Sequence, residues 1–180
     1  IQKSLTPYKP SNFTSRCTQH LTQKPMAHNA FDESLQLIFI VSLPRSGSTL
    51  VEQILASHPD ADASYELTEI NAIARELESK KLSDVPYGLD KLSEQDKAHY
   101  AARYLNFIAP LRGKNKVFID KQPANFHHIA LIKTLFPNAK ILEVTRDKAA
   151  TAWSLYKHSF SEGHAYSYDF KSLAQYINDY

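Results

Sequence analysis

An eight-residue segment at positions 42–49 has the residue types and spacing of an anion-binding loop. It reads Ser-Leu-Pro-Arg-Ser-Gly-Ser-Thr and follows an apolar run that predicts a buried strand over about residues 36–43. A helix is predicted from about residue 48. A strand, a tight turn and a helix in this order direct backbone N–H groups and the positive end of the helix dipole at one point. We therefore expect a phosphate or a sulfate to bind there, with Arg45 adding a cation whose planar fork suits oxyanions.

The loop departs from the Walker pattern G-x-x-x-x-G-K-[ST] at two positions. Ser42 replaces the first glycine, Gly47 keeps the second, and Ser48 stands where the lysine should be. That lysine normally reaches the β- and γ-phosphates, so its absence argues against ordinary ATP or GTP hydrolysis. A βα turn that binds no ligand is the alternative interpretation of this segment.

Three more charged residues are expected at the same edge of the fold as Arg45, because each directly follows a predicted strand. These residues are Glu66, Lys121 and Arg146. The carboxyl ends of parallel strands meet at one edge of a sheet, and α/β proteins bind their ligands there. Ser154 lies eight residues after Arg146 with a helix starting between them. Its hydroxyl is therefore expected to join Arg146 on one anion.

The elements that must position these residues alternate between strands and helices. Strands are predicted at about residues 36–43, 62–65, 117–119 and 141–145, and helices at about 48–57, 67–80, 93–110, 124–136, 148–160 and 169–179. This alternation is typical of an α/β fold with a parallel sheet and helices on both faces. Apolar residues at positions 50, 51, 54 and 55 form the stripe of the first helix. Ser93 and Asp96 have the spacing of a capping box.

Composition favours a globular protein and excludes several classes. The sequence is 43% hydrophobic and 22% charged, and its net charge of +2 without a basic run gives no reason to expect nucleic acid. No apolar run approaches the length of a membrane span, and the first residues lack the apolar region of a signal peptide, so no membrane partner is expected. The single cysteine, Cys17, excludes an internal disulfide. It favours a reducing compartment, so we expect a cytoplasmic protein.

The chain divides into a polar extension and one domain. Residues 1–34 contain prolines and many Ser, Thr and Gln residues, which is typical of a loop or linker. Residues 35–180 are expected to form the domain. The sequence begins at Ile1 rather than Met and ends at Tyr180 without a terminating signal. We interpret it as a fragment whose domain is incomplete at the C-terminus.

Two adjacent segments resemble the sulfotransferase family. Residues 44–50, Pro-Arg-Ser-Gly-Ser-Thr-Leu, resemble its 5′-phosphosulfate loop P-R-S-G-T-T-L, with Ser48 in place of the more usual threonine. The continuation Val-Glu-Gln-Ile-Leu-Ala-Ser-His-Pro at 51–59 is most similar to bacterial members of the tyrosylprotein type, which are often attached to tetratricopeptide repeats. The resemblance implies a three-layer, P-loop-NTPase-like fold. It also implies that the parent protein can contain such repeats upstream of this sequence.

The resemblance further implies a reaction. A sulfuryl group moves from 3′-phosphoadenosine 5′-phosphosulfate (PAPS) to a hydroxyl acceptor, which is a peptide tyrosine, a glycan or a small molecule. Adenosine 3′,5′-bisphosphate is left, and no metal is required, because the loop and the arginines neutralise the nucleotide. Two other functions stay open, a P-loop nucleotide or small-molecule kinase and a non-catalytic remnant that binds nucleotide. The missing Walker lysine speaks against the kinase.

Roles for individual residues follow from the same resemblance. The segment Val-Thr-Arg-Asp around Arg146, with Ser154, is similar to the site for the 3′-phosphate. Glu66 matches the catalytic base of the tyrosylprotein type, although Tyr65 stands where a glycine is usual. Lys121, in Asp-Lys-Gln-Pro, matches a lysine beside the leaving phosphate, where a cation lowers the barrier. The catalytic set is Glu66, Lys121 and Arg45. The donor-binding set is Arg45, Ser46, Gly47, Ser48, Thr49, Arg146 and Ser154.

Simpler interpretations exist for two of these residues. Glu66 can be a carboxylate that only stabilises the N-terminal end of the following helix, and Glu69 is a competing candidate for the base. Arg146 can form a surface ion pair with Asp147 or Glu143.

Overall fold

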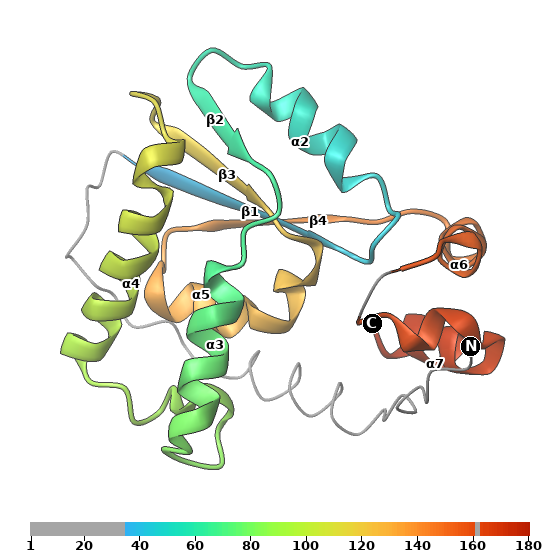
Figure 1. Ribbon diagram of the computed structural model, residues 1–180. Helices are drawn as coiled ribbons and strands as arrows, with labels where there is room; N and C mark the ends of the chain where they lie inside the picture. The colour runs from blue at the N-terminus through green and yellow to red at the C-terminus, as the bar shows by residue number, and fades with distance from the viewer. Residues whose placement is uncertain (1–34, 161–162) are drawn as a thin grey trace.

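The protein is built around a four-stranded parallel sheet in the order β2-β3-β1-β4 (Figure 1). The computed structural model describes residues 35–160 and 163–180, so the predicted linker at residues 1–34 lies outside the described residues. The strands are β1 (Gln36–Ser42), β2 (Ala61–Ser64), β3 (Val117–Lys121) and β4 (Lys140–Val144). All three pairings are parallel, so the carboxyl ends of the strands lie at one edge. The predicted α/β fold is confirmed.

Six α-helices flank the sheet in the described residues. They are α2 (Ser48–Ala56), α3 (Glu69–Lys80), α4 (Glu94–Ile108), α5 (Ile129–Leu135), α6 (Lys148–Lys157) and α7 (Phe170–Asp179). Figure 1 shows α2 over one face of the sheet and α3, α4 and α5 on the other. Across the part of the chain that the structure describes, no helix combines the length and the apolar character needed to cross a membrane.

Two of the predicted boundaries that differ from the structure lie beside the site. The segment expected as one helix at residues 124–136 is a 3-10 turn at Pro123–His128 followed by α5, because His128, at φ −118°, leaves the helical region between them. Strand β3 continues two residues past the predicted end at Ile119, because its pairing with β1 continues through Lys121. Lys121 is therefore the last residue of the strand rather than a residue beyond its end.

A large apolar core holds β1 and β3 against α3, α4 and α5. The Phe39 ring of β1 lies 5.7 Å from the Tyr104 ring of α4 and 6.4 Å from the Phe136 ring, and all three side chains are buried. Burial of each such side chain contributes about 1.5–3 kcal/mol. A second core attaches α6 and α7 to the carboxyl end of β1. Its buried members are Val41, Leu43, Phe126, Leu155, Tyr166, Leu173, Tyr176 and Ile177.

The start of α4 is fixed by the predicted capping box, which is confirmed. The Asp96 N–H donates to Ser93 Oγ at 3.1 Å, and the Ser93 N–H donates to Asp96 Oδ2 at 3.0 Å. These bonds satisfy two backbone donors that would otherwise lack partners. The cap sets the register of α4 and with it the side chains that this helix presents to the sheet and to α3.

The apolar stripe predicted for α2 does not face the sheet as a whole. Leu50 is 66% exposed and Ile54 is 61% exposed, whereas Ser48 and Glu52 of the same helix are buried. Helix α2 packs against β1, β2 and β3, and β2 and β3 end in polar or charged residues, Ser64 in β2 and Asp120 and Lys121 in β3. The side of α2 that is turned inward thus carries Ser48 and Glu52.

Candidate functional site

The loop between β1 and α2 has a left-handed backbone at two positions. Arg45 has φ 70° and Gly47 has φ 96°. A Cβ at Gly47 would meet nothing within 4 Å, so the backbone angle rather than space favours glycine there. Arg45 holds this angle with a side chain, which costs on the order of 1 kcal/mol and is found most often at functional sites.

The first turn of α2 is open to an anion. Among the described residues, no side chain caps this helix, and the N–H groups of Leu50 and Val51 donate to the Gly47 carbonyl at 3.0 and 3.2 Å. For the N–H groups of residues 46–49, no backbone acceptor is found in the described part of the chain, so they can bind a ligand at the helix N-terminus. Of the remaining loop residues, Ser46 and Ser48 are buried and Thr49 is exposed.

The fold brings Arg45, Ser154 and Arg146 together from distant parts of the chain. Arg45 Nε donates to Ser154 Oγ at 3.2 Å, across 109 residues of sequence. Arg146 Nη1 lies 3.5 Å from the Arg45 carbonyl oxygen, across 101 residues. The two guanidinium groups and the hydroxyl thus come from the loop, from the end of β4 and from α6. This arrangement can hold two anionic groups of one ligand.

The acidic residues proposed as surface partners of Arg146 have other contacts. Asp147 caps α6 by accepting from the Ala150 N–H at 2.8 Å. Glu143 Oε1 accepts from the Tyr180 hydroxyl at 2.9 Å. Within residues 35–160 and 163–180, neither carboxylate forms an ion pair with Arg146. The guanidinium of Arg146 is therefore available to a ligand.

Glu66 and Lys121 form an ion pair at the ends of β2 and β3. Lys121 Nζ donates to Glu66 Oε1 at 2.9 Å. The Lys121 side chain is only 6% exposed, whereas that of Glu66 is 56% exposed. The carboxylate can therefore meet a molecule from solution, while the ammonium is held in the wall of the site. The residues predicted as base and as leaving-group cation lie in direct contact.

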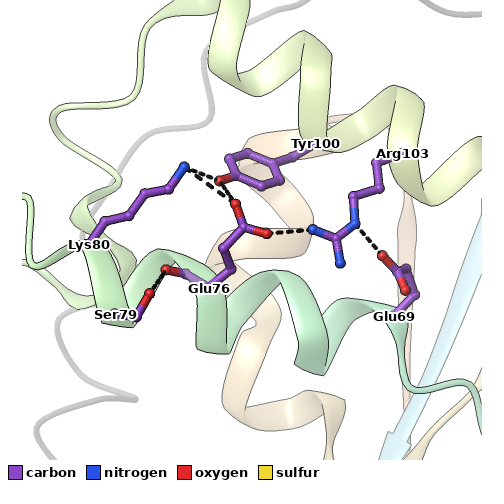
Figure 2. A network of polar contacts seen from close by, with 6 residues as sticks. All are labelled: Glu69, Glu76, Ser79, Lys80, Tyr100 and Arg103. Carbon is purple, nitrogen blue, oxygen red and sulfur yellow. Dashed lines mark hydrogen bonds and ion pairs between the residues drawn. The ribbon is translucent and has the colours of Figure 1, made fainter.

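The competing base, Glu69, belongs to a network that joins α3 to α4 (Figure 2). Arg103 contacts Glu69 Oε1 through Nε and Glu76 Oε2 through Nη1, both at 2.6 Å. The Tyr100 hydroxyl donates to Glu76 Oε1 at 2.7 Å, and this bond is the main reason why the pKa of Glu76 is lowered. Glu69 is buried in this structural ion pair. Of the two candidates for the base, Glu66 is therefore the one whose carboxylate is exposed to solution.

We expect Arg103→Ala to lower the free energy of unfolding by about 1–3 kcal/mol, because the buried Glu69 carboxylate loses its charged partner. Urea unfolding followed by circular dichroism measures the change. Lys80→Ala is the matched control, since Lys80 contacts the same network from an exposed position, and its effect should be smaller. An unchanged urea midpoint for Arg103→Ala would show that the network does not hold α3 to α4.

Asp120 is a buried carboxylate beside Lys121. It is 1% exposed, and its Oδ2 accepts from the Tyr104 hydroxyl at 2.8 Å. No partner among the described residues reaches Oδ1. Burial raises the pKa of Asp120 to about 7, although the Tyr104 hydrogen bond opposes this rise. The available sequence signal was an acidic residue directly after the apolar run at residues 117–119, and it was interpreted only as part of the Asp-Lys-Gln-Pro segment.

Glu52 of α2 is a functional candidate that sequence reasoning missed. It is 2% exposed. Burial raises its pKa, the Lys121 ammonium opposes that rise, and the Glu66 carboxylate adds to it. Glu52 therefore lies within electrostatic reach of both members of the ion pair. Its sequence signal was weak, because a glutamate between apolar positions of a helix ordinarily points to solvent.

No group of three or more His, Cys, Asp or Glu side chains in the described ranges could hold a metal ion. The metal-free reaction stays a prediction.

Comparisons with known proteins agree on one family. The model of the sulfotransferase family matches residues 36–180. An uncharacterized protein of Aquifex aeolicus is 31% identical over 152 residues, which are 79% of this chain and 20% of that protein. Protein-tyrosine sulfotransferase of Drosophila melanogaster is 30% identical over 148 residues, 78% of this chain and 29% of the relative. Human protein-tyrosine sulfotransferase 1 is 31% identical over 133 residues, 70% of this chain and 35% of the relative. The chain thus spans about a third or less of these relatives.

Proposed function

Because the chain belongs to the sulfotransferase family, we propose that the protein containing it transfers a sulfuryl group from PAPS to a hydroxyl acceptor. The observation that carries this proposal is the convergence of Arg45, Ser154 and Arg146 beside the open first turn of α2. A donor with one phosphate at each end of its ribose requires two neighbouring anion sites. A βα turn that binds no ligand would not require two such anion sites.

Different residues are proposed to bind the two ends of the donor. The backbone of residues 45–49 and the Arg45 side chain hold the 5′-phosphosulfate, as helix N-termini and guanidinium groups hold anions elsewhere. Arg146 and Ser154 hold the 3′-phosphate. The buried hydroxyl residues Ser46 and Ser48 belong to the donor-binding set, as do Gly47 and Thr49. Residues 35–180 form the part of the sulfotransferase domain that carries this site.

The proposed reaction is an in-line displacement at sulfur. The acceptor oxygen attacks the sulfur while Glu66 takes the hydroxyl proton. The bond from sulfur to the bridging oxygen breaks, and its electron pair stays on the 5′-phosphate, where Lys121 stabilises the developing charge. Lys121 must therefore turn from Glu66 toward the leaving oxygen, and this movement leaves the carboxylate free to accept the proton.

A tyrosine side chain of a protein is the first acceptor to test. Two of the relatives are named protein-tyrosine sulfotransferases, and Glu66 is exposed enough to meet a side chain on another molecule. Glycans and small hydroxyl compounds are the other acceptor classes. Tetratricopeptide repeats upstream and a cytoplasmic location remain predictions about the parent protein.

We expect the 3′-phosphate to dominate nucleotide discrimination. Calorimetry on the full-length protein should show adenosine 3′,5′-bisphosphate binding roughly 10–100-fold more tightly than AMP, as one charge-assisted contact of ~1.5–3 kcal/mol predicts. Arg146→Ala should remove most of that difference and leave AMP binding nearly unchanged. Equal affinity of the wild type for both ligands would overturn the assignment. Tighter binding of ATP with magnesium than of the bisphosphate would favour a kinase instead.

A further inference from the structure

Tyr65 places a large aromatic side chain in water beside the proposed base. It is 90% exposed, the highest value among the large hydrophobic side chains of the described residues. In the same part of the chain, it has no hydrogen bond and no ring contact. Single exposed apolar residues are common and by themselves imply no role. Tyr65, however, directly precedes Glu66, so the Cα atoms of the two residues are only about 3.8 Å apart.

The backbone on both sides of Tyr65 is fixed to strand β3 and to the residue that follows it. The buried Ser64 hydroxyl donates to the Ile119 carbonyl at 3.3 Å, and the Leu67 carbonyl accepts from Gln122 Nε2 at 3.3 Å. Between these contacts, the ion pair at the ends of β2 and β3 holds the residue after Tyr65 at 2.9 Å. Tyr65 also lies outside the left-handed region of the backbone. An acceptor that contacts its ring therefore has to order little more than the ring itself.

An acceptor that gives its proton to Glu66 must lie over this surface. Its hydroxyl has to come within about 2.6–3.2 Å of the carboxylate, whose side chain is 56% exposed. The part of the acceptor that bears the hydroxyl is then within reach of the side chain at position 65. A planar ring in water gains most from contact with a second aromatic ring, because offset and edge-to-face arrangements add to the burial of both surfaces. A phenol also suits a carboxylate base, since its pKa of about 10 is far below that of an alkyl hydroxyl.

We propose that Tyr65 is a specificity-determining residue whose ring contacts the acceptor and selects aromatic hydroxyl compounds, such as the tyrosine side chain of a peptide, over aliphatic ones. This inference rests on the proposed function, since it takes Glu66 as the base, and it narrows the acceptor to one chemical class. The contact is made by the ring and not by the hydroxyl of Tyr65. It does not involve the donor, which is bound by the loop at residues 42–49, Arg146 and Ser154.

The first test measures binding and needs no turnover. Calorimetry on the full-length protein, saturated with adenosine 3′,5′-bisphosphate, compares a short tyrosyl peptide with the same peptide carrying serine and with a disaccharide. Tyr65→Ala should raise the Kd of the tyrosyl peptide roughly 5–20-fold and change that of the other two ligands by less than about twofold. Tyr65→Phe keeps the ring and should bind the tyrosyl peptide within about twofold of the wild type.

Phe107→Ala is the matched control for the loss of an exposed ring. Phe107 is 39% exposed and lies near the end of α4, from which the chain leads into the start of β3. It is therefore near the edge of the sheet opposite the site, and its loss should leave the binding of all three ligands unchanged. NMR observes the contact directly. The ring signals of Tyr65, assigned by their loss in Tyr65→Phe, should shift on addition of the tyrosyl peptide and not of the seryl peptide.

The second test is sulfuryl transfer to the same tyrosyl peptide. Tyr65→Ala should raise the acceptor KM roughly 5–20-fold, because the ring contributes to binding of the acceptor. It should change kcat by less than about threefold, since Glu66 and Lys121, which act on the reacting atoms, are untouched. The donor KM should stay at the wild-type value, because the donor-binding set does not include Tyr65.

The outcomes separate failure of this inference from failure of the proposed function. An active wild type whose binding of the tyrosyl peptide is unchanged in Tyr65→Ala, or is no tighter than that of the seryl peptide, would overturn the inference and leave the proposed function intact. An equal loss in Tyr65→Phe would also overturn it, because the hydroxyl would then make the contact. A loss confined to the disaccharide would indicate a glycan acceptor instead. A wild type that transfers no sulfuryl group, but binds the tyrosyl peptide through Tyr65, would overturn the proposed function and leave the aromatic contact intact.

Discussion

Glu66→Gln is expected to slow sulfuryl transfer about 10²–10⁴-fold, because glutamine keeps the size and polarity of the side chain but cannot take the acceptor proton. This loss corresponds to about 3–5 kcal/mol of barrier, at about 1.4 kcal/mol per factor of ten. Binding of adenosine 3′,5′-bisphosphate should change little, since the donor-binding set does not include Glu66. Steady-state rates of the full-length protein with an ordinary hydroxyl acceptor measure the effect.

The acidity of the acceptor separates proton removal from leaving-group stabilisation. A phenol that is already ionised at the assay pH needs no base, so it should restore the rate of Glu66→Gln. Lys121→Ala should be slow with both acceptors, because the charge on the leaving oxygen stays unstabilised. Glu66→Gln with wild-type activity on the ordinary acceptor would reduce Glu66 to a helix-end carboxylate. Glu69 would then be the next acid to test, although its ion pair with Arg103 holds it away from solvent.

Asp120→Asn is expected to stabilise the protein above neutral pH. Burial raises the pKa of Asp120 from 3.8 to about 7 in the folded state. The folded protein therefore holds a proton that the unfolded chain has released, and stability falls as the pH rises through this window. The full difference is about 4 kcal/mol, at 1.36 kcal/mol per pKa unit. Asparagine carries no charge and can still accept from the Tyr104 hydroxyl at 2.8 Å.

Urea unfolding at pH 5 and pH 8 measures this effect. Between these two values the wild type should lose about 2–3 kcal/mol relative to Asp120→Asn. Asp96→Asn is the control, because the Ser93 hydroxyl lowers the pKa of Asp96 and the carboxylate is ionised at both pH values. Its loss of stability should therefore be the same at pH 5 and pH 8. A difference between wild type and Asp120→Asn that does not change with pH would show that Asp120 is not held protonated by burial.

The parts of this protein that local sequence determines were predicted well. The order of strands and helices follows from apolar periodicity and from prolines and polar turns, which act over a few residues. The capping box at Ser93 and Asp96 is local in the same way, and it was confirmed. The loop at residues 42–49 and the four charged residues near the strand ends were identified because parallel strands present their carboxyl ends at one edge. That rule needs only the order of the elements.

Tertiary structure alone decided which of these side chains meet. Periodicity predicts that residues share a face of a helix, but not what lies opposite that face. For this reason the sequence identified the apolar stripe of α2 but not that Leu50 and Ile54 are exposed, and Glu52 went unnoticed. The contact between Arg45 and Ser154 spans 109 residues, and that between Lys121 and Glu66 spans 55. Such pairs depend on strand order and on the packing of helices across the sheet, which no short stretch of sequence encodes.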